Sequence, residues 1–253
     1  MVRMGFPVEH LEALSGSRAG SSVVTDSAGT RVHEPSGSVD RDAVAKERYF
    51  DPSLSTAWTG PTTPATLVRY DAEKQVSNTL YSTVYKPTEL EAMETTIAIF
   101  VGGACRENGN GTSRAGYGVF FGEGSKYNAK GVVDCGQKQT SQAAEITAMS
   151  KSLEALNEAW KTVGLIEVVI ITDSDYLVKS MCEHIGKWLK NGFKTSRGGK
   201  VENEGLLRNL HERIEELRGE LVAVKFWRVK RSMNKEAVGL AKEALNWNLG
   251  REA

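Results

Sequence analysis

The sequence predicts an α/β fold for residues 95–250, preceded by a largely disordered N-terminal extension. Three observations lead to this prediction: short segments rich in β-branched residues, one long apolar run, and intervening segments with apolar residues at helical spacing. Strand and helix patterns that alternate along one chain are typical of the α/β class. Periodicity defines this class but no particular topology.

Five strands are expected. The first, at residues 95–101, is rich in β-branched residues, and the second, at 114–122, follows a Gly- and Asn-rich turn that suits an antiparallel hairpin. The third is expected at 130–136. Residues 166–172 form an almost continuous apolar run, which indicates a central strand covered on both faces. The fifth strand is expected at 221–229.

Four segments have the apolar spacing of helices. Ser141 is placed to cap the first of them, because a Ser directly before a helical pattern can accept a hydrogen bond from a free backbone N–H group. The segments are residues 141–160, 174–185, 203–219 and 234–247.

Residues 1–94 are rich in Ser, Thr, Gly and Pro and show no sustained period, which predicts a low-complexity, mostly disordered leader. Short helical turns are possible within it at residues 42–50 and 88–96. The three aromatic residues of RYFDPSLSTAW, at 48–58, could dock onto the domain that follows. The domain boundary is therefore expected at residue 94, with one domain over 95–250.

The 253 residues carry a formal net charge of zero, so bulk charge does not indicate nucleic-acid binding. The charge is uneven, however. From Val101 onward there are 23 Lys and Arg against 19 Asp and Glu, whereas the first 100 residues have 9 against 13.

Cysteine use and hydropathy bear on the compartment. The three cysteines, Cys105, Cys135 and Cys182, form no CxxC pair, which argues against a zinc site or a disulfide framework. No apolar run reaches the roughly 18 residues of a membrane span, and the start lacks the apolar core of a signal peptide. We expect an intracellular protein without membrane contact, nuclear or cytoplasmic, and leave a mitochondrial location open.

Five segments, in this order, resemble a type 1 ribonuclease H domain. The resemblance implies a ribonuclease H-like mixed five-stranded sheet flanked by helices, and a partner that is an RNA–DNA hybrid or double-stranded nucleic acid. The segments are IAIFVGGACRENG (97–109), QTSQAAEITAM (139–149), VVIITDSDY (168–176), WLKNGFKTSRGGKVEN (188–203) and FWRVKRSMNKEAVGLAKEAL (226–245).

The resemblance also assigns four acidic positions that hold two metal ions for phosphodiester cleavage. Glu145 and Asp173 stand at two of them, whereas Gly102 and Val238 stand at the other two. Two-metal hydrolysis needs several carboxylates that converge on cations about 4 Å apart. We therefore expect Glu145 and Asp173 to bind Mg or Mn weakly if at all, with weak or no hydrolysis.

Other acids could in principle substitute. Glu236 points roughly 200° around its helix from Val238, which directs it away from the site. Asp175 and Glu107 are nearer candidates. The segment before the last helix is about four residues shorter than the family's loop, and Ser232 stands near the place of the family's histidine.

The resemblance assigns contacts to RNA and to phosphate. Contacts to 2′-hydroxyl groups are implied for Asn108 with Gly109 and for Ser141 with Gln142. A phosphate pocket is implied for Lys138, Thr140 and Asn203.

A basic stretch at residues 187–200 resembles the protrusion with which the family grips the DNA strand. It contains five Lys and Arg residues and no acid. A charge run is usually a solvated face, but basic residues interleaved with aromatic, Thr and Ser side chains favour phosphate contact. The residues assigned to this surface are Trp188, Lys190, Phe193, Lys194, Thr195, Ser196 and Arg197. A second acid-free cluster comprises Lys225, Arg228, Lys230, Arg231 and Lys235.

Three functions remain open. The first is a nucleic-acid-binding domain of ribonuclease H type with little or no hydrolysis. The second is an active, metal-dependent RNA–DNA hybrid endoribonuclease. The third is a scaffold whose basic face binds an acidic protein or the chain's own acidic leader. A monomer is expected, and no protein partner is indicated.

Overall fold

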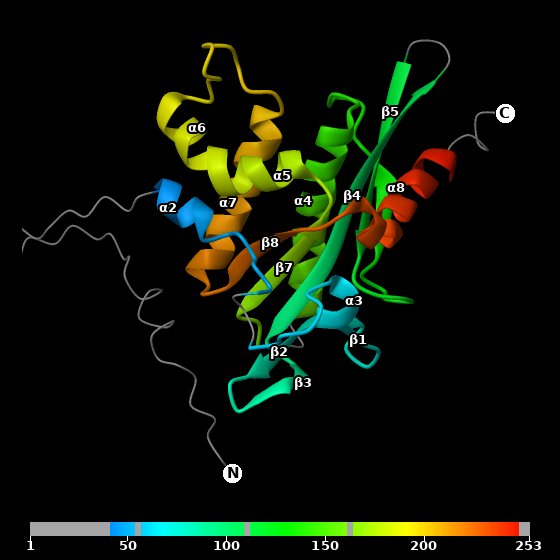
Figure 1. Cartoon of the computed structure of the whole chain (residues 1–253). Helices are drawn as coiled ribbons and strands as arrows, with labels where there is room; N and C mark the ends of the chain where they lie inside the picture. The colour runs from blue at the N-terminus through cyan, green and yellow to red at the C-terminus, as the bar shows by residue number, and fades with distance from the viewer. Residues whose placement is uncertain (1–40, 54–56, 109–111, 161–163, 248–253) are drawn as a thin grey trace, which may run out of the picture.

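The structure, a computed structural model, describes residues 41–53, 57–108, 112–160 and 164–247. Figure 1 shows the arrangement of the elements. The elements before the central sheet core are α2 (Arg41–Lys46), α3 (Pro64–Leu67), β1 (Val68–Asp71), β2 (Val76–Thr83) and β3 (Lys86–Ala92). They are followed by β4 (Thr96–Asn108), β5 (Thr112–Phe120), β6 (Ala129–Val132), α4 (Ser141–Trp160), β7 (Glu167–Thr172), α5 (Asp175–Lys179), the π-helix η1 (Ser180–His184), α6 (Ile185–Asn191), α7 (Glu204–Gly219), β8 (Ala223–Arg228), the 3-10 helix η2 (Arg231–Met233) and α8 (Lys235–Trp247).

The strands form one mixed sheet. β4 pairs antiparallel with β5, and β5 with β6, whereas β4 pairs in parallel with β7, and β7 with β8. These five strands correspond to the five that the sequence predicts, and the β4–β5 pair is the expected hairpin. The mixed, ribonuclease H-like five-stranded sheet flanked by helices is therefore confirmed.

Three further strands enlarge this sheet to eight. β5 pairs with β4 only from Phe100 onward. Nearer the start of β4, β2 pairs with it antiparallel, at Ser77 and Ala98. β1 and β3 pair with β2. The extension thus supplies a partner for the first part of β4, which β5 does not cover.

These strands correct the expectation of a mostly disordered leader over 1–94 for its described part. Residues 88–92, for which a helical turn was possible, lie in β3 instead, because they pair with β2. The turn expected near residue 42 is present as α2. Residues 1–40 and 54–56 of that leader lie outside the described residues.

The helices cover both faces of the sheet. α4 packs on β4 and β5 and also contacts α7, while α8 packs on the opposite face over β4, β5 and β6 (Figure 1). The main core between the sheet and α4 includes Ile97, Ile99, Ile146 and Met149, which are fully buried. Burial of each such side chain contributes roughly 1.5–3 kcal/mol. No helix among the described residues is long and apolar enough to cross a membrane.

The apolar run at β7 is covered on both faces, as predicted. Ile170 belongs to the core beneath α4, whereas Val169 and Ile171 belong to a second cluster with Leu67 and Trp227. Phe50 and Trp58 of the extension pack against this second cluster, with ring centroids of Phe50 and Trp227 5.2 Å apart. The prediction that aromatic residues of 48–58 dock onto the domain is confirmed for these two residues.

Arg48 anchors the extension to the domain. Its side chain is 6% exposed, donates to the carbonyl O of Met181 at 3.1 Å and pairs with Glu215 at 2.7 Å. The backbone of this segment also bonds to β8, since the N of Phe226 donates to the O of Arg48 at 2.7 Å. Residues 48–50 are therefore part of the folded domain.

Candidate functional site

Two adjacent glycines of β4 lie between two helices. A Cβ atom on Gly102 would lie 3.0 Å from the backbone N of Val238 and 3.1 Å from its Cγ2, so this glycine contacts α8. A Cβ atom on Gly103 would lie 2.8 Å from the backbone N of Glu145, so the next residue contacts α4. Successive strand residues face opposite sides, and the two missing side chains let both helices approach the strand closely.

The carboxylate of Asp173, directly after β7, is bound by two side chains that follow β8. Asn234 donates from Nδ2 to Oδ1 at 2.7 Å and also to the carbonyl O of Val101 at 2.9 Å. Arg231 donates from Nη1 to Oδ2 at 3.0 Å. The Asp173 side chain is 12% exposed and that of Arg231 59%. Both oxygens of this carboxylate therefore have partners within the chain.

Glu145 is half-buried in the first part of α4. Ser174 donates a hydrogen bond from Oγ to Oε2 of Glu145, and its hydroxyl also caps α5 by accepting from the backbone N of Leu177. Burial raises the pKa of Glu145, and the charge of Asp173 adds to this rise, while the Ser174 hydrogen bond and Arg231 oppose it. The carboxyl group therefore keeps its proton to higher pH than an exposed Glu.

The four positions assigned to metal-binding acids thus lie together at one edge of the sheet. Gly102 contacts Val238, and Glu145 is bonded to the residue that follows Asp173. The three other acids that could substitute at the missing positions do not complete a group of four carboxylates. Asp175 forms ion pairs with Lys179 and Arg228, while Glu107 and Glu236 are exposed. Within residues 41–247, gaps excepted, no three His, Cys, Asp or Glu side chains are grouped so as to hold a metal.

The described residues assigned to 2′-hydroxyl contacts lie at the end of β4 and at the start of α4. Asn108 is the last residue of β4, and Gly109 lies outside the described residues. Ser141 and Gln142 are exposed at the start of α4. The predicted cap is wrong by one residue: Thr140 accepts from the backbone N of Ala143 at 3.1 Å, because Ser141 is already the first helical residue.

The implied phosphate pocket contains an acid that the sequence analysis did not assign. Lys138 forms an exposed ion pair with Glu202 at 2.7 Å, and the neighbouring Asn203 donates to the hydroxyl of Tyr176 at 3.3 Å. Asn203 has a left-handed backbone with φ of 58° directly before α7. Lys138 therefore reaches the start of α7, but Glu202 competes there with any phosphate.

One residue of the basic protrusion, Phe193, was assigned to the nucleic-acid surface, and the structure corrects this assignment. Phe193 is 0% exposed, its ring lies 5.9 Å from that of Trp188, and the guanidinium of Arg208 lies 4.0 Å from its centroid. Phe193 is thus a core residue and cannot stack on a base; it follows Gly192, which ends α6 in a left-handed turn. Trp188 is half-buried against the same core.

The rest of the protrusion is a solvent-exposed turn. The backbone N of Thr195 donates to the O of Gly199 at 2.7 Å, which presents Lys194, Thr195, Ser196 and Arg197 on the surface. Lys190 instead forms an ion pair at 2.7 Å with Asp42 of α2.

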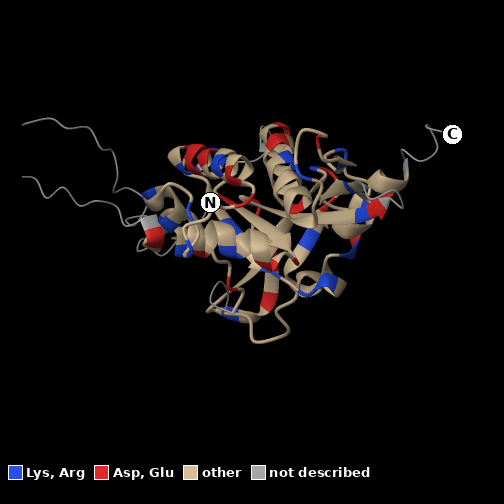
Figure 2. Ribbon diagram, turned by 90° about the horizontal axis from the view of Figure 1, so that it is seen from above, with Lys and Arg blue, Asp and Glu red and all other residues tan. Residues whose placement is uncertain are grey.

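Three of the five side chains of the second basic cluster bind other parts of the chain. Lys225 donates to the carbonyl O of Glu47, Arg228 pairs with Asp175, and Arg231 pairs with Asp173. Lys230 and Lys235 are exposed. Figure 2 shows Lys and Arg spread over several elements with Asp and Glu among them.

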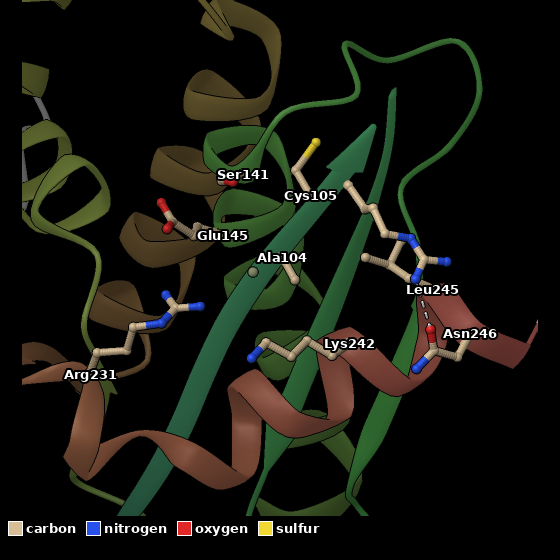
Figure 3. Close-up of a pocket in the computed structure, with 10 residues that line it drawn as sticks. Ala104, Cys105, Ser141, Glu145, Arg231, Lys242, Leu245 and Asn246 are labelled. Atoms are coloured by element: carbon tan, nitrogen blue, oxygen red, sulfur yellow. Dashed lines mark hydrogen bonds between the residues drawn. The ribbon is translucent and has the colours of Figure 1, made fainter. Parts of the chain in front are cut away.

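A pocket of about 380 Å³ adjoins the acidic corner, and sequence reasoning missed it. It lies between β4, the start of α4 and α8 (Figure 3), and it is lined by Gly103, Ala104, Cys105, Arg106, Ser141, Glu145, Arg231, Lys242, Leu245 and Asn246. Strand spacing could have indicated part of it, since residues two apart on a strand share a face.

The mixed sheet, its flanking helices and the acidic side chains at one sheet edge define a ribonuclease H-like α/β domain. The profile of the RNase H family matches residues 94–246, which is more than half of the chain. The chain belongs to the RNase H family.

Curated relatives match only a part of their length. Ribonuclease H1 of Homo sapiens is 36% identical over 108 residues, which covers 43% of this chain and 36% of the human protein. Ribonuclease H of Methylococcus capsulatus is 33% identical over 117 residues, covering 46% of this chain and 68% of the bacterial protein. The chain thus spans little more than a third of the human relative.

Solved structures of related proteins are also similar. RNase H1 from the halophilic archaeon Halobacterium salinarum is 25% identical with a TM-score of 0.37, and the match covers 60% of this chain and 98% of that one. The foamy viral protease-reverse transcriptase in complex with RNA/DNA hybrid is 21% identical with a TM-score of 0.48, covering 64% of this chain and 21% of that one.

The RNase H family uses divalent metals, but the side chains at this corner do not fit a two-metal site. Gly102 and Val238 provide no ligand atom, and both oxygens of Asp173 already accept hydrogen bonds. Glu145 alone could offer a carboxylate oxygen that has no partner among the described residues. A divalent ion bridged by several carboxylates has too few ligands here.

Proposed function

We propose that this chain is a nucleic-acid-binding domain of ribonuclease H type, which binds an RNA–DNA hybrid or double-stranded nucleic acid and hydrolyses it weakly or not at all. One observation carries the second half of the proposal: Arg231 and Asn234 occupy the carboxylate of Asp173. A metal ion at that carboxylate would have to displace a guanidinium held by charge and hydrogen bonding.

The exposed turn of the protrusion supports the binding half. Lys194 and Arg197 are exposed, and neither side chain has a hydrogen-bond or ion-pair partner among the described residues. Ser141 and Gln142 are exposed at the start of α4, where free backbone N–H groups and the helix dipole favour an anion. Together they offer cations and hydrogen-bond donors to a phosphate backbone.

Binding is tested by anisotropy of a labelled RNA–DNA hybrid, with double-stranded RNA and double-stranded DNA as comparisons. We expect the affinity to fall steeply between about 50 and 200 mM salt, because phosphate contacts release counterions. Hybrid affinity that does not respond to salt, or no binding of any duplex, would refute the proposal and favour the scaffold.

Cleavage is tested on the same hybrid with Mg²⁺ or Mn²⁺. We expect a rate at least about 10³-fold below that of a relative with four acids, because loss of a bridging ligand removes several kcal/mol of transition-state stabilisation. Robust cleavage by the parent that disappears in Asp173→Asn would establish the alternative, an active RNA–DNA hybrid endoribonuclease, since Glu145 and Asp173 are both retained.

A further inference from the structure

The pocket beside the acidic corner is lined by three cationic side chains. Arg106 comes from β4, Arg231 from η2 and Lys242 from α8, and Glu145 is the single acid among the lining residues. Figure 3 shows the side chains of Arg231 and Lys242 extending toward one another, with Glu145 on the α4 side. The pocket thus carries three cationic side chains, one from β4 and two from the consecutive elements η2 and α8.

The charge of these cations is only partly neutralised. Arg231 pairs with Asp173 through one of its five donor hydrogens, and no other partner of it is found among the described residues. Arg106 donates to the neutral amide of Asn246 at 3.2 Å, which holds the guanidinium without cancelling its charge. Lys242 is exposed and has no acidic partner within the described parts of the chain.

The walls of the pocket favour an anion of modest size. Gly103 and Ala104 line the pocket with little or no side chain, and Ser141 is the first residue of the 20-residue helix α4, whose N-terminal end carries partial positive charge. A volume of about 380 Å³ lies at the lower end of the range for ligand pockets, roughly 300–1,000 Å³. The charge of the lining side chains matches a phosphate group, because Arg and Lys are the side chains that bind phosphate oxygens.

We propose that this pocket binds a backbone phosphate of the nucleic acid without a metal ion, with Lys242 and Arg106 as phosphate ligands and Arg231 as a fixed cation held on Asp173. The proposal rests on the nucleic-acid-binding function above and assigns one phosphate of that ligand to this site. Side-chain cations thereby take the place that divalent ions would need at a corner with too few carboxylates.

The test measures anisotropy of a labelled RNA–DNA hybrid in EDTA and in Mg²⁺ at matched ionic strength. We expect affinity in Mg²⁺ to be no higher than in EDTA. The double variant Arg106→Ala/Lys242→Ala should bind about tenfold more weakly, the loss of one charge-assisted contact. It should also flatten the salt slope by about 0.9, the value for one phosphate.

Lys86→Ala is the control, because Lys86 is an exposed lysine of β3 and does not line the pocket. If Arg106→Ala/Lys242→Ala behaves like Lys86→Ala while Lys194→Ala/Arg197→Ala weakens binding, the pocket proposal is overturned and the proposed function stands. Binding that requires Mg²⁺ also overturns it.

A second readout is independent of duplex binding. Titration with inorganic phosphate should shift the amide resonances of Gly103 and Ala104 in the parent and not in Arg106→Ala/Lys242→Ala. If these shifts occur but no duplex binds, the pocket holds phosphate and the proposed function fails. Equal shifts in parent and variant overturn the assignment of the two ligands.

Discussion

Arg231 and Asp173 form an ion pair at 3.0 Å between η2 and the end of β7, and this pair sets the electrostatics of the whole corner. Asp173 would otherwise be an almost buried carboxylate beside Glu145. The guanidinium neutralises Asp173 and lowers the pKa of Glu145, although burial still raises that pKa overall. Arg231 thus stabilises the charged forms of Asp173 and Glu145, at a corner where Gly102 and Val238 stand in place of the other two acids.

The protrusion should contact phosphates through its free cations. Replacing Lys194 and Arg197 with Ala should flatten the dependence of log affinity on log salt by up to about two units, one per phosphate contact. Salt titrations of hybrid binding measure this slope. A slope unchanged by the double variant would show that the turn does not touch the nucleic acid.

The raised pKa of Glu145 predicts a pH-dependent gain in Glu145→Gln. A carboxyl group whose pKa is higher in the folded chain stabilises the fold at low pH, and this stabilisation is lost as pH rises through the folded value. A glutamine cannot ionise, so the variant should gain in Tm relative to the parent above about pH 4.3, the ordinary Glu value. Exposed Glu154→Gln on the same helix is the control. Parallel Tm curves for parent and variant would contradict the prediction.

Close packing of α8 at Gly102 predicts a steric cost for any side chain there. Gly102→Ala should lower the free energy of unfolding by about 1–3 kcal/mol, as overpacking does, because the backbone of Val238 must move. Gly239→Ala is the matched control within α8, since nothing lies near its Cβ position. It should stabilise the protein by about 1 kcal/mol. Urea unfolding that places both variants on the same side of the parent would contradict this.

The contact between Gly102 and Val238 also limits how well acids can be restored at these two positions. Gly102→Asp combined with Val238→Asp should recover some metal-dependent cleavage if the pocket is otherwise intact, but with lower stability than the parent. Val238→Asp removes the Cγ2 contact of Gly102 but leaves the 3.0 Å approach of the helix backbone. Hybrid cleavage and Tm, measured together, separate a catalytic failure from a folding failure.

Arg48 should stabilise the domain although it belongs to the extension. Arg48→Ala should cost about 2 kcal/mol, less than the 3–5 kcal/mol of fully buried pairs, because Glu215 is 37% exposed. Arg69→Ala, an exposed arginine of β1, is the control and should change stability by less than about 0.5 kcal/mol. Equal urea midpoints for the two variants would show that the contacts of Arg48 add nothing to folding.

Local pattern in the sequence determined the central sheet and the positions of its acids. β7 is apolar at successive residues because helix and extension cover its two faces, and α4 and α8 carry their apolar residues at helical spacing. The order of these elements, together with the resemblance, placed Glu145 and Asp173 at one edge. Such patterns predict structure because the buried face of a strand contains every second residue, and that of a helix every third or fourth.

Only the tertiary structure decided the role of the extension. β2 buries Ser77, Asn78 and Thr79, and these polar residues conceal the alternation that marks a strand. They can be buried because they find partners far along the chain: Asn78 donates to the O of Thr96 at 2.6 Å, and the Thr79 and Thr96 hydroxyls are bonded at 2.7 Å. A sequence pattern cannot show such partners in advance.

The use of each charged side chain was likewise decided by tertiary contacts. The sequence presented Arg231 as one of a basic cluster and indicated no role for Lys242. In the fold, the first neutralises Asp173 and the second enters a pocket beside Glu145. Phe193 was assigned to a binding surface and is a core residue. Composition and spacing determine which side chains are available, but charge neutralisation and burial depend on the distances that folding creates.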